Sequence, residues 1–383
     1  MNLKRLIVRL LLACLAVVTG CAGREEPVRR MKERVFALAA EQLPAIDARL
    51  GEGEFARSVR PDGTAWNSNI DWWCSGFYPG SLWYLYRYNK DEDIRALAEK
   101  HTRRLAPLRD RKADHDIGFQ LNCSYGGAYA ATGDEAWLEM VRVGADKLCE
   151  RFNPAVGATR SWDNRSFPVI IDNMMNLEIL LEAWKHTGEE RYREIALAHA
   201  RTTMKNHFRP DYSTWHLVDY DPETGAVLRK QTVQGYADDS MWARGEAWAL
   251  YGYTMMARET GEAEFLAQAR RIADLLLERL PEDGIPYWDF DCPDIPDTYR
   301  DASAGAIMAA ALVRLAQLTG EKRYRACALR QLRTLAGPDY LAAPGTNGGF
   351  LLQHSVGNLP SGSEVDVPLS YADYYFLEAL YYL

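Results

Sequence analysis

A short phrase that recurs along the chain constrains its fold more than any other feature. Five copies, the first of them degenerate, begin at residues 89, 132, 187, 260 and 319 and read NKDEDI, TGDEAW, TGEERY, TGEAEF and TGEKRY. In each copy a glycine or lysine precedes acidic residues, which suit a helix N-terminus. The segments that follow, such as YREIALAHARTTM, alternate apolar and charged residues with helical spacing. The phrase therefore predicts a repeated turn, each followed by a half-exposed outer helix.

The segments before the copies, and one that closes the chain, differ in composition. They are rich in Ala, Gly and aromatic residues, carry few charges, and read GSLWYLYRY, SYGGAYAAT, NLEILLEAWKHT, GEAWALYGYTMMARET, GAIMAAALVRLAQLT and YADYYFLEALYYL. Helices that are apolar on most sides are buried. Residues 27–50 supply one more outer helix. We therefore expect six inner and six outer helices in alternation, with no convincing strand pattern.

Six helical hairpins need neighbours to bury their inner faces. Six nearly charge-free inner helices need a shared centre, which favours closure into an all-α, six-hairpin (α/α)6 toroid over an open solenoid. Residues 21–383 are expected to form this single domain. The loops into the inner helices would line one mouth of the ring. They are rich in Trp, Tyr, Asp, Gly and Pro, and function is expected there.

The start of the chain has the pattern of an export signal. Lys4, Arg5 and Arg9 accompany an apolar run that is too short to span a bilayer comfortably. The run ends in VTGC, which resembles a bacterial lipoprotein box, so residues 1–20 are expected to be a lipoprotein signal peptide and Cys21 the lipidated residue. An ordinary secretory signal is the alternative. No Asp follows Cys21, which favours outer-membrane anchoring by that lipid alone, toward the periplasm or the cell surface.

Charge and cysteine content exclude some classes of protein. Loss of residues 1–20 removes three basic residues and takes the net charge from −8 to −11, so a nucleic-acid partner is not expected. Besides Cys21, the mature chain keeps five cysteines, which include no CxxC pair. Their spacing predicts neither a disulfide framework nor a zinc site.

The predicted mouth combines aromatic rings with carboxylates, as carbohydrate sites do. Asp116 and Asp172 form a candidate pair, because two carboxylates in one pocket separate into a protonated acid and an ionised partner. Asp is also a favoured helix N-cap, and the pattern alone supports cap and catalyst equally. His115 and His216 are potential metal ligands, but no HExxH or paired-His spacing supports a metal site.

Longer motifs carry a family resemblance. The stretches HDIGF, SWDN, VIIDNMMNLEIL, QGYADDSMWARGEAWALYGY and DASAGAI resemble those of the unsaturated glucuronyl hydrolases, glycoside hydrolase family 88, over essentially the whole mature chain. The resemblance implies the six-hairpin toroid. It also implies removal of the 4,5-unsaturated uronic acid that a polysaccharide lyase leaves at a non-reducing end, by hydration of its vinyl ether. The implied partner is an unsaturated uronic-acid oligosaccharide, glycosaminoglycan disaccharides being the expected class, and no metal or organic cofactor is implied.

The resemblance also assigns residues. Asp172 matches the general acid/base and Asp116 the second essential carboxylate. Substrate-contacting positions are matched by His115, Trp162, His216, Thr232, Gln234, Arg244 and Trp248, and Tyr78 stands where many relatives carry Trp. Arg244 has an alternative role, as a structural partner of Asp238 or Asp239.

Other readings remain open. Related unsaturated rhamnogalacturonyl hydrolases act on pectin fragments, an inverting glycosidase would cleave saturated glycosides, and a glycan-binding lipoprotein would lack catalysis. Residues 334–383 contain no Lys or Arg, so a substrate sulfate would meet Asn358, Ser361 or Ser363, or would be tolerated without direct contact. The sequence predicts no oligomeric state.

Overall fold

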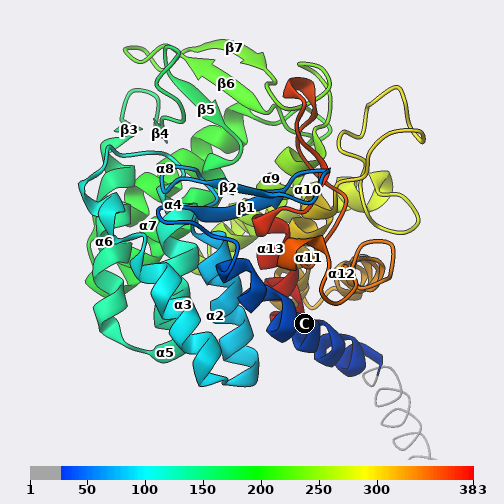
Figure 1. Cartoon of the computed structure of the whole chain (residues 1–383). Coiled ribbons are helices and arrows are strands. Elements are labelled where there is room, and N and C mark those ends of the chain that lie inside the picture. The colour runs from blue at the N-terminus through cyan, green and yellow to red at the C-terminus, as the bar shows by residue number, and fades with distance from the viewer. Residues whose placement is uncertain (1–26) are drawn as a thin grey trace, which may run out of the picture.

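The computed structural model describes residues 27–383. The predicted signal peptide and Cys21 lie outside the described residues, so both remain predictions. The described chain is mostly helical (Figure 1).

Two sets of helices alternate along the chain. The inner set is α2 (Phe77–Asn89), the continuous segment α4 (Ile117–Leu121), η2 (a π-helix, Asn122–Gly126) and α5 (Gly127–Thr132), then α7 (Asn173–Thr187), α9 (Ala243–Thr260), α11 (Ala302–Thr319) and α13 (Ser370–Tyr382). The outer set is a helix over residues 27–47, α3 (Glu92–Arg103), α6 (Leu138–Glu150), α8 (Glu190–Asn206), α10 (Ala263–Arg279) and α12 (Lys322–Leu335). Short 3-10 turns are η1 (Ala106–Asp110), η3 (Glu135–Trp137), η4 (Asn347–Gly349) and η5 (Leu359–Ser361).

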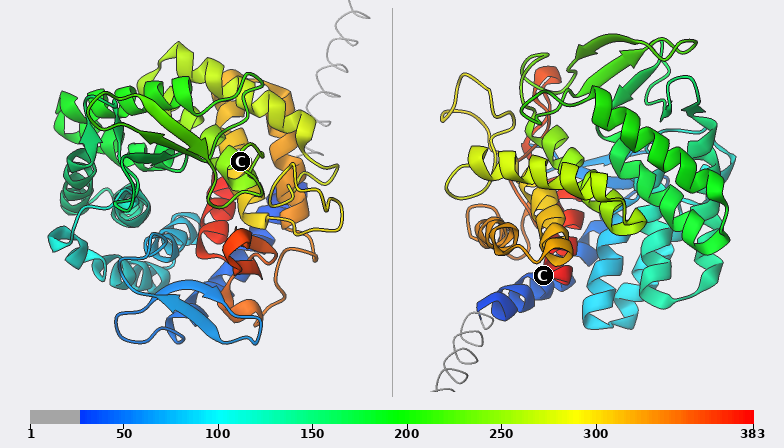
Figure 2. Two further views of the ribbon diagram at one scale, coloured as in Figure 1. Left: turned by 90° about the horizontal axis from the view of Figure 1, so that it is seen from above. Right: turned by 180° about the vertical axis from the view of Figure 1, so that it is seen from behind.

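The inner helices form a closed series of contacts. Each inner helix or segment packs against the next, and α13 packs against α2. The view from above shows helices arranged around a centre (Figure 2).

Burial separates the two sets as the sequence predicts. Every residue from 243 to 257 of α9 is buried, whereas the buried residues of α8 recur at helical spacing along one face. Helix α11 is long and apolar enough to cross a membrane, yet all its residues from 302 to 313 are buried among other helices. The assignment of apolar segments to the interior is therefore confirmed.

The recurrent phrase forms the turn between an inner and an outer helix. Its glycine adopts a left-handed conformation with φ near +70° at Gly133, Gly188, Gly261 and Gly320. Each of these glycines donates its N–H to the carbonyl four residues back and so caps the inner helix. The acidic residue after each glycine occupies the N-cap position of the following helix. The phrase thus specifies where one helix ends and the next begins.

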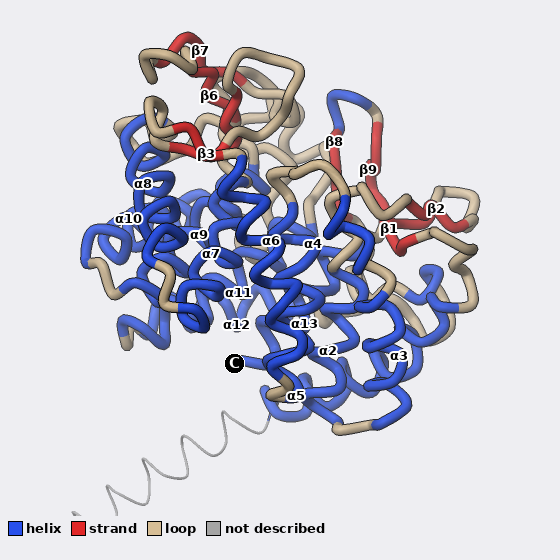
Figure 3. The backbone as a smooth tube through the Cα atoms, turned by 90° about the vertical axis from the view of Figure 1, so that its left-hand side faces the viewer, coloured by secondary structure: helices blue, strands red, loops and turns tan. Residues whose placement is uncertain are grey.

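The expectation of no strands was wrong. Within residues 27–383, nine short strands form four antiparallel sheets: β1 (Phe55–Val59) with β2 (Ala65–Ser68), β3 (Phe152–Asn153) with β4 (Ala158–Thr159), β5 (Pro168–Ile170) with β6 (Leu217–Tyr220) and β7 (Val227–Gln231), and β8 (Ser355–Asn358) with β9 (Ser363–Val367). They have two to five residues each, too few for an alternating pattern to stand out. All lie in segments that lead into inner helices, and they gather away from the C-terminal end of the bundle (Figure 3).

Candidate active site

A cavity of about 400 Å³ lies where these segments meet the inner helices. Most of the predicted site residues line it. They are His115, Asp116, Trp162, Asp172, Gln234 and Arg244, together with Asn358, Ser361 and Ser363. Residues separated by nearly 250 positions in the sequence thus share one wall.

Asp172 follows strand β5 and immediately precedes α7. Strand β5 pairs with β6, and the Ile171 N–H donates to the His216 carbonyl at 2.9 Å, which fixes the backbone there. Asp172 occupies the N-cap position, but its side chain makes no capping hydrogen bond. Burial raises the pKa of Asp172 to about 6, although Arg244 opposes the shift. Its remaining 14% side-chain exposure faces the cavity. The geometry therefore favours a catalytic acid role for Asp172 over a role as a helix cap.

His216 lies buried behind Asp172. Burial, reinforced by Arg244, lowers the pKa of His216 to about 3, so the ring is neutral. Its Nδ1 accepts the Val233 N–H at 3.1 Å, which leaves the ring proton on Nε2. That Nε2 is 3.7 Å from Oδ2 of Asp172. His216 therefore presents a neutral donor toward the carboxyl group.

Thr232 supports this arrangement from outside the cavity wall. Its hydroxyl accepts the Gly235 N–H at 2.8 Å, and its own N–H donates to Asp238 Oδ1 at 2.8 Å. The same hydroxyl is 3.4 Å from Nδ1 of His216. Thr232 thus shapes the loop that fixes the His216 ring, rather than lining the cavity.

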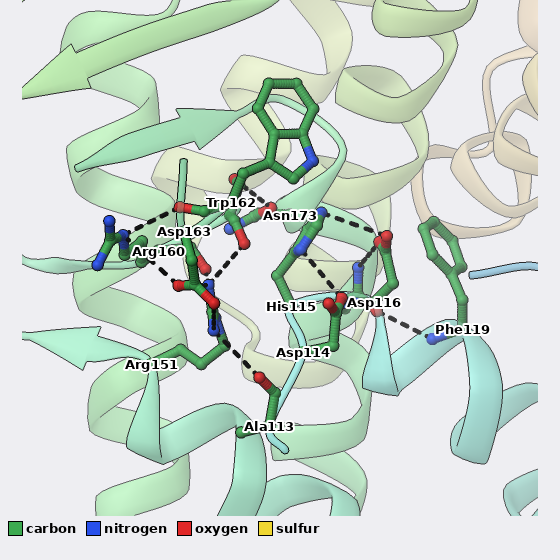
Figure 4. A network of polar contacts seen from close by, with 12 residues as sticks. Ala113, Asp114, His115, Asp116, Phe119, Arg151, Arg160, Trp162, Asp163 and Asn173 are labelled. Carbon is green, nitrogen blue, oxygen red and sulfur yellow. Dashed lines mark hydrogen bonds and ion pairs between the residues drawn. The ribbon is translucent and has the colours of Figure 1, made fainter. Parts of the chain in front are cut away.

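Asp116 lies at the start of α4, beside a histidine held between two carboxylates (Figure 4). His115 Nε2 is 3.2 Å from Asp116 Oδ2, and Nδ1 is 3.1 Å from Asp114 Oδ1. Burial raises the pKa of Asp116 to about 7; His115 opposes the shift, and Asp114 and Asp172 reinforce it. Burial alone would lower the pKa of His115, but Asp116 and Asp114 raise it above its usual value. The mouth therefore holds a coupled set of proton-binding groups.

Arg151 anchors both the loop that carries His115 and the loop that carries Trp162. It donates to the carbonyls of Ala113 at 3.1 Å and Ser161 at 2.6 Å, and pairs with Asp163 at 3.0 Å. The backbones that carry His115 and Trp162 are thereby held by one guanidinium (Figure 4).

Asp114, His115 and Asp116 also satisfy one geometric condition for a metal site. Their ligand atoms lie within 4.8 Å of one another. The prediction that the enzyme needs no metal remains a prediction, and it is testable with a chelator.

Arg244 is almost fully buried at the cavity wall, with 2% exposure. It donates to the Val356 carbonyl and, at 2.5 Å, to the Gly357 carbonyl of β8. Its ion-pair partner is Asp301 at 3.5 Å. The predicted pairing with Asp238 or Asp239 was wrong, because these lie in the loop before α9 whereas the guanidinium extends toward β8 and α11.

Two further predicted residues do not line the cavity. The Tyr78 hydroxyl donates to the Leu43 carbonyl at 2.9 Å, and its ring packs edge-on against His101 at 4.8 Å. Tyr78 thus faces the outer layer, so the structure does not support its substrate-binding assignment. Trp248 is completely buried. Its indole partly offsets the rise in the pKa of Asp172 that burial causes, although the Trp248 Nε1 does not reach hydrogen-bond geometry in this structure.

Several cavity residues were missed by the sequence-based assignment. They are Asp71, Trp72, Trp73, Asp114, Phe119, Ile170, Gly357, Glu364 and Tyr371. The adjacent tryptophans of the DWW stretch were the available signal, since one loop carries them both into the wall. Arg57 stacks on Trp72 with its guanidinium carbon 4.0 Å from the ring centre and pairs with Glu364 at 2.7 Å.

Cavity, carboxylate pair and aromatic wall together define a site suited to acid-catalysed chemistry on a sugar. The model of Glycosyl Hydrolase Family 88 matches residues 53–376. The chain therefore belongs to this family of glycosidases, and the resemblance identified from the sequence is confirmed.

Among its relatives is the unsaturated glucuronyl hydrolase of Formosa agariphila, 45% identical over 315 residues, which cover 80% of this chain and 79% of that protein. The unsaturated glucuronyl hydrolase of Bacillus sp. strain GL1 is 36% identical over 82% of this chain and 86% of that protein. A crystal structure of an unsaturated glucuronyl hydrolase specific for heparin matches with a TM-score of 0.90 at 45% identity, over 92% of this chain and 96% of that one. A Streptococcus agalactiae enzyme variant complexed with dGlcA-GalNAc6S matches with a TM-score of 0.79 at 31% identity, over 92% and 90% of the two chains.

Proposed function

We propose that the protein removes the 4,5-unsaturated glucuronic acid from the non-reducing end of lyase-generated oligosaccharides, by hydrating its vinyl ether. The observation that carries the proposal is that two buried carboxylates, Asp116 and Asp172, line one cavity. Burial keeps Asp172 protonated up to about pH 6 and Asp116 up to about pH 7. Relatives with the same activity in their names span most of the chain.

The proposed chemistry needs an acid, a water and no metal. Asp172 gives its proton to carbon 4 of the double bond, and a water molecule adds its oxygen at carbon 5. The water's surplus proton returns to the carboxylate pair, which restores the acid. The resulting hemiketal opens by itself and releases the rest of the oligosaccharide. The neutral His216 has its Nε2 3.7 Å from Asp172 Oδ2, beyond hydrogen-bond distance, so it places no positive charge beside the acid that must hold a proton.

The walls of the cavity suit the two parts of such a substrate. Arg244 is the one cation among the Lys and Arg side chains of the described residues that lines this cavity, so it is the partner for the uronate carboxylate. Trp162 and Trp73 offer ring faces to the sugars. Asn358, Ser361 and Ser363 offer uncharged hydrogen-bonding groups at the β8–β9 hairpin. Glycosaminoglycan disaccharides are the proposed substrates, with pectin fragments as the alternative.

We further infer that the predicted mature chain, 21–383, is a single domain, and that its described residues, 27–383, form one (α/α)6 toroid. The support is the packing of each inner helix on the next and of α13 on α2. An open solenoid would leave the first and last inner helices apart.

The test is a spectrophotometric assay of the vinyl ether band on unsaturated disaccharides prepared by lyases from heparin, chondroitin, hyaluronan and pectin. We expect loss of absorbance with at least one glycosaminoglycan disaccharide. Faster turnover of the pectin disaccharide would favour the rhamnogalacturonyl alternative, and binding without turnover would favour a glycan-binding protein. Cleavage of a saturated glucuronide at a comparable rate would point to a conventional glycosidase.

We also propose export as an outer-membrane lipoprotein, supported by VTGC at residues 18–21. Mass spectrometry of the mature N-terminal peptide should find a lipid on Cys21. A Cys21→Ser variant should be released from the membrane fraction; an unmodified mature N-terminus in the wild type would contradict the proposal.

A further inference from the structure

Both candidate catalytic carboxylates occupy N-cap positions, and neither caps its helix. Asp116 precedes α4 and Asp172 precedes α7, yet neither side chain makes a capping hydrogen bond. An Asp at this position normally accepts an N–H from the second or third helical residue. Something else must therefore satisfy the start of each helix.

At α4, a side chain from another helix supplies the capping acceptor that Asp116 does not. Asn176 of α7 accepts the Phe119 N–H through Oδ1 at 2.9 Å. Phe119 is the third residue of α4, so this N–H is one that Asp116 would otherwise accept. The amide Nδ2 of Asn176 donates to Asp116 Oδ1 at 3.3 Å.

Asn176 is tightly packed between the two helices. The residue is completely buried. A Cβ at Gly118 would lie 2.7 Å from the Asn176 Oδ1 and 2.8 Å from its Cα, so only glycine allows α4 to approach α7 this closely. Asn176 also lies one turn beyond Asp172 on α7, and such residues share a helix face. One side chain thus connects the two carboxylate-bearing helices.

We propose that Asn176 is a positioning residue for the hydration reaction: it caps α4 in place of Asp116, and so directs the Asp116 carboxylate into the cavity at a fixed separation from Asp172. This inference rests on the proposed function. It adds a role for the second asparagine of the DNMMN stretch, which the sequence-based assignment did not include.

Two substitutions separate the two hydrogen bonds. Asn176→Ala removes both, so Asp116 becomes free to cap α4 and leave the cavity. We expect kcat to fall roughly tenfold to a hundredfold, as misplacement of a reacting group does, with a smaller change in KM. Asn176→Asp keeps the acceptor for the Phe119 N–H but replaces the donor to Asp116 with a carboxylate. The added carboxylate beside Asp116 should raise the pKa of Asp116, so the pH profile of kcat/KM should differ from that of the wild type.

A buried amide far from the cavity provides the matched control. Gln331 of α12 is completely buried and donates to the Gly284 carbonyl at 3.0 Å. Gln331→Ala should lower the melting temperature while leaving the pH profile at its wild-type position. Each variant is assayed as the full mature chain on the best unsaturated disaccharide.

The outcomes distinguish the inference from the function on which it rests. If the wild type hydrates no unsaturated disaccharide, the proposed function fails. If the wild type is active but folded Asn176→Ala and Asn176→Asp both keep its kcat and pH profile, Asn176 is only structural and the inference is overturned. A loss of kcat in Asn176→Ala with a shifted profile in Asn176→Asp supports it, and Asn176→Ala alone decides through kcat if Asn176→Asp does not fold.

Discussion

Replacing Asp172 with Asn should stabilise the protein while abolishing its activity. Burial raises the pKa of Asp172 from 3.8 to about 6. Between these values the unfolded chain loses the proton while the folded protein keeps it, so stability falls as pH rises. Above pH 6 the folded protein carries the full penalty, which is about 3 kcal/mol for a shift of roughly two units.

The uncharged amide removes this penalty, and the gain depends on pH. We expect Asp172→Asn to gain about 3 kcal/mol in free energy of unfolding at pH 8 but only about 1 kcal/mol at pH 4.5, where the folded protein still holds its proton and the ionisation of the unfolded chain has developed only part of the penalty. With an unfolding entropy of about 2 cal/mol/K per residue, the larger gain corresponds to a melting temperature roughly 4 °C higher. Calorimetry or chemical denaturation at the two pH values measures both gains. Loss of the general acid should lower kcat by about 10²–10⁴-fold.

Asp163 provides a matched control, because its pKa is lowered rather than raised and its replacement by Asn should change the stability in the opposite direction. Hydrogen bonds from Lys112 and Arg151 lower the pKa of Asp163 to about 2. Its side chain is 45% exposed, so Asp163→Asn should lose only a little stability at pH 8. Near-normal activity in folded Asp172→Asn, or a stability loss at pH 8, would refute the reasoning.

Four further predictions follow from the same geometry. The wild-type kcat/KM should fall about tenfold per pH unit above roughly pH 6, because Asp172 must hold its proton; a flat pH–rate profile from pH 5 to 8 would exclude it as the acid. Arg244→Ala should weaken substrate binding about ten- to a hundredfold, as loss of a charge-assisted hydrogen bond does. It should also lower the melting temperature, because the Arg244 guanidinium donates to two carbonyls of β8. Unchanged catalytic efficiency with a large drop in melting temperature would show that Arg244 has only a structural role. Tyr78→Phe should keep wild-type kinetics and lose about 1 kcal/mol of stability, since its hydroxyl bonds only the outer layer; a rise in KM would restore it to the substrate site. Dialysis against EDTA should leave activity unchanged, and loss that Ca²⁺ or Mn²⁺ restores would place a required ion beside His115.

The helical architecture was predictable because its signals are local. The turn phrase places a glycine where φ is positive, at residues 133, 188, 261 and 320, and an acid at the next residue, where a helix begins. Apolar content separated buried from half-exposed helices for the same reason, since burial on all sides requires few charges. The strands were not predicted, because two to five residues are too few to establish an alternation of apolar and polar residues.

The site was only partly predictable, because side-chain direction depends on packing between distant segments. Tyr78 and Trp73 lie five residues apart, yet one points outward to Leu43 and the other lines the cavity. Asp116 makes no capping bond to α4, and the Phe119 N–H donates instead to Asn176, which is 60 residues from Asp116 in the sequence. The pattern of one segment carries no information about such a contact.

The most direct test of the account uses an unsaturated glucuronyl disaccharide whose glycosidic oxygen is replaced by CH2. Hydration at carbons 4 and 5 does not require the glycosidic bond to break, whereas displacement at the anomeric carbon does. The account predicts that the enzyme consumes the vinyl ether absorbance of this analogue, and that Asp172→Asn does not. A wild-type enzyme that turns over the natural disaccharide and binds the analogue, but leaves its double bond intact, would contradict it.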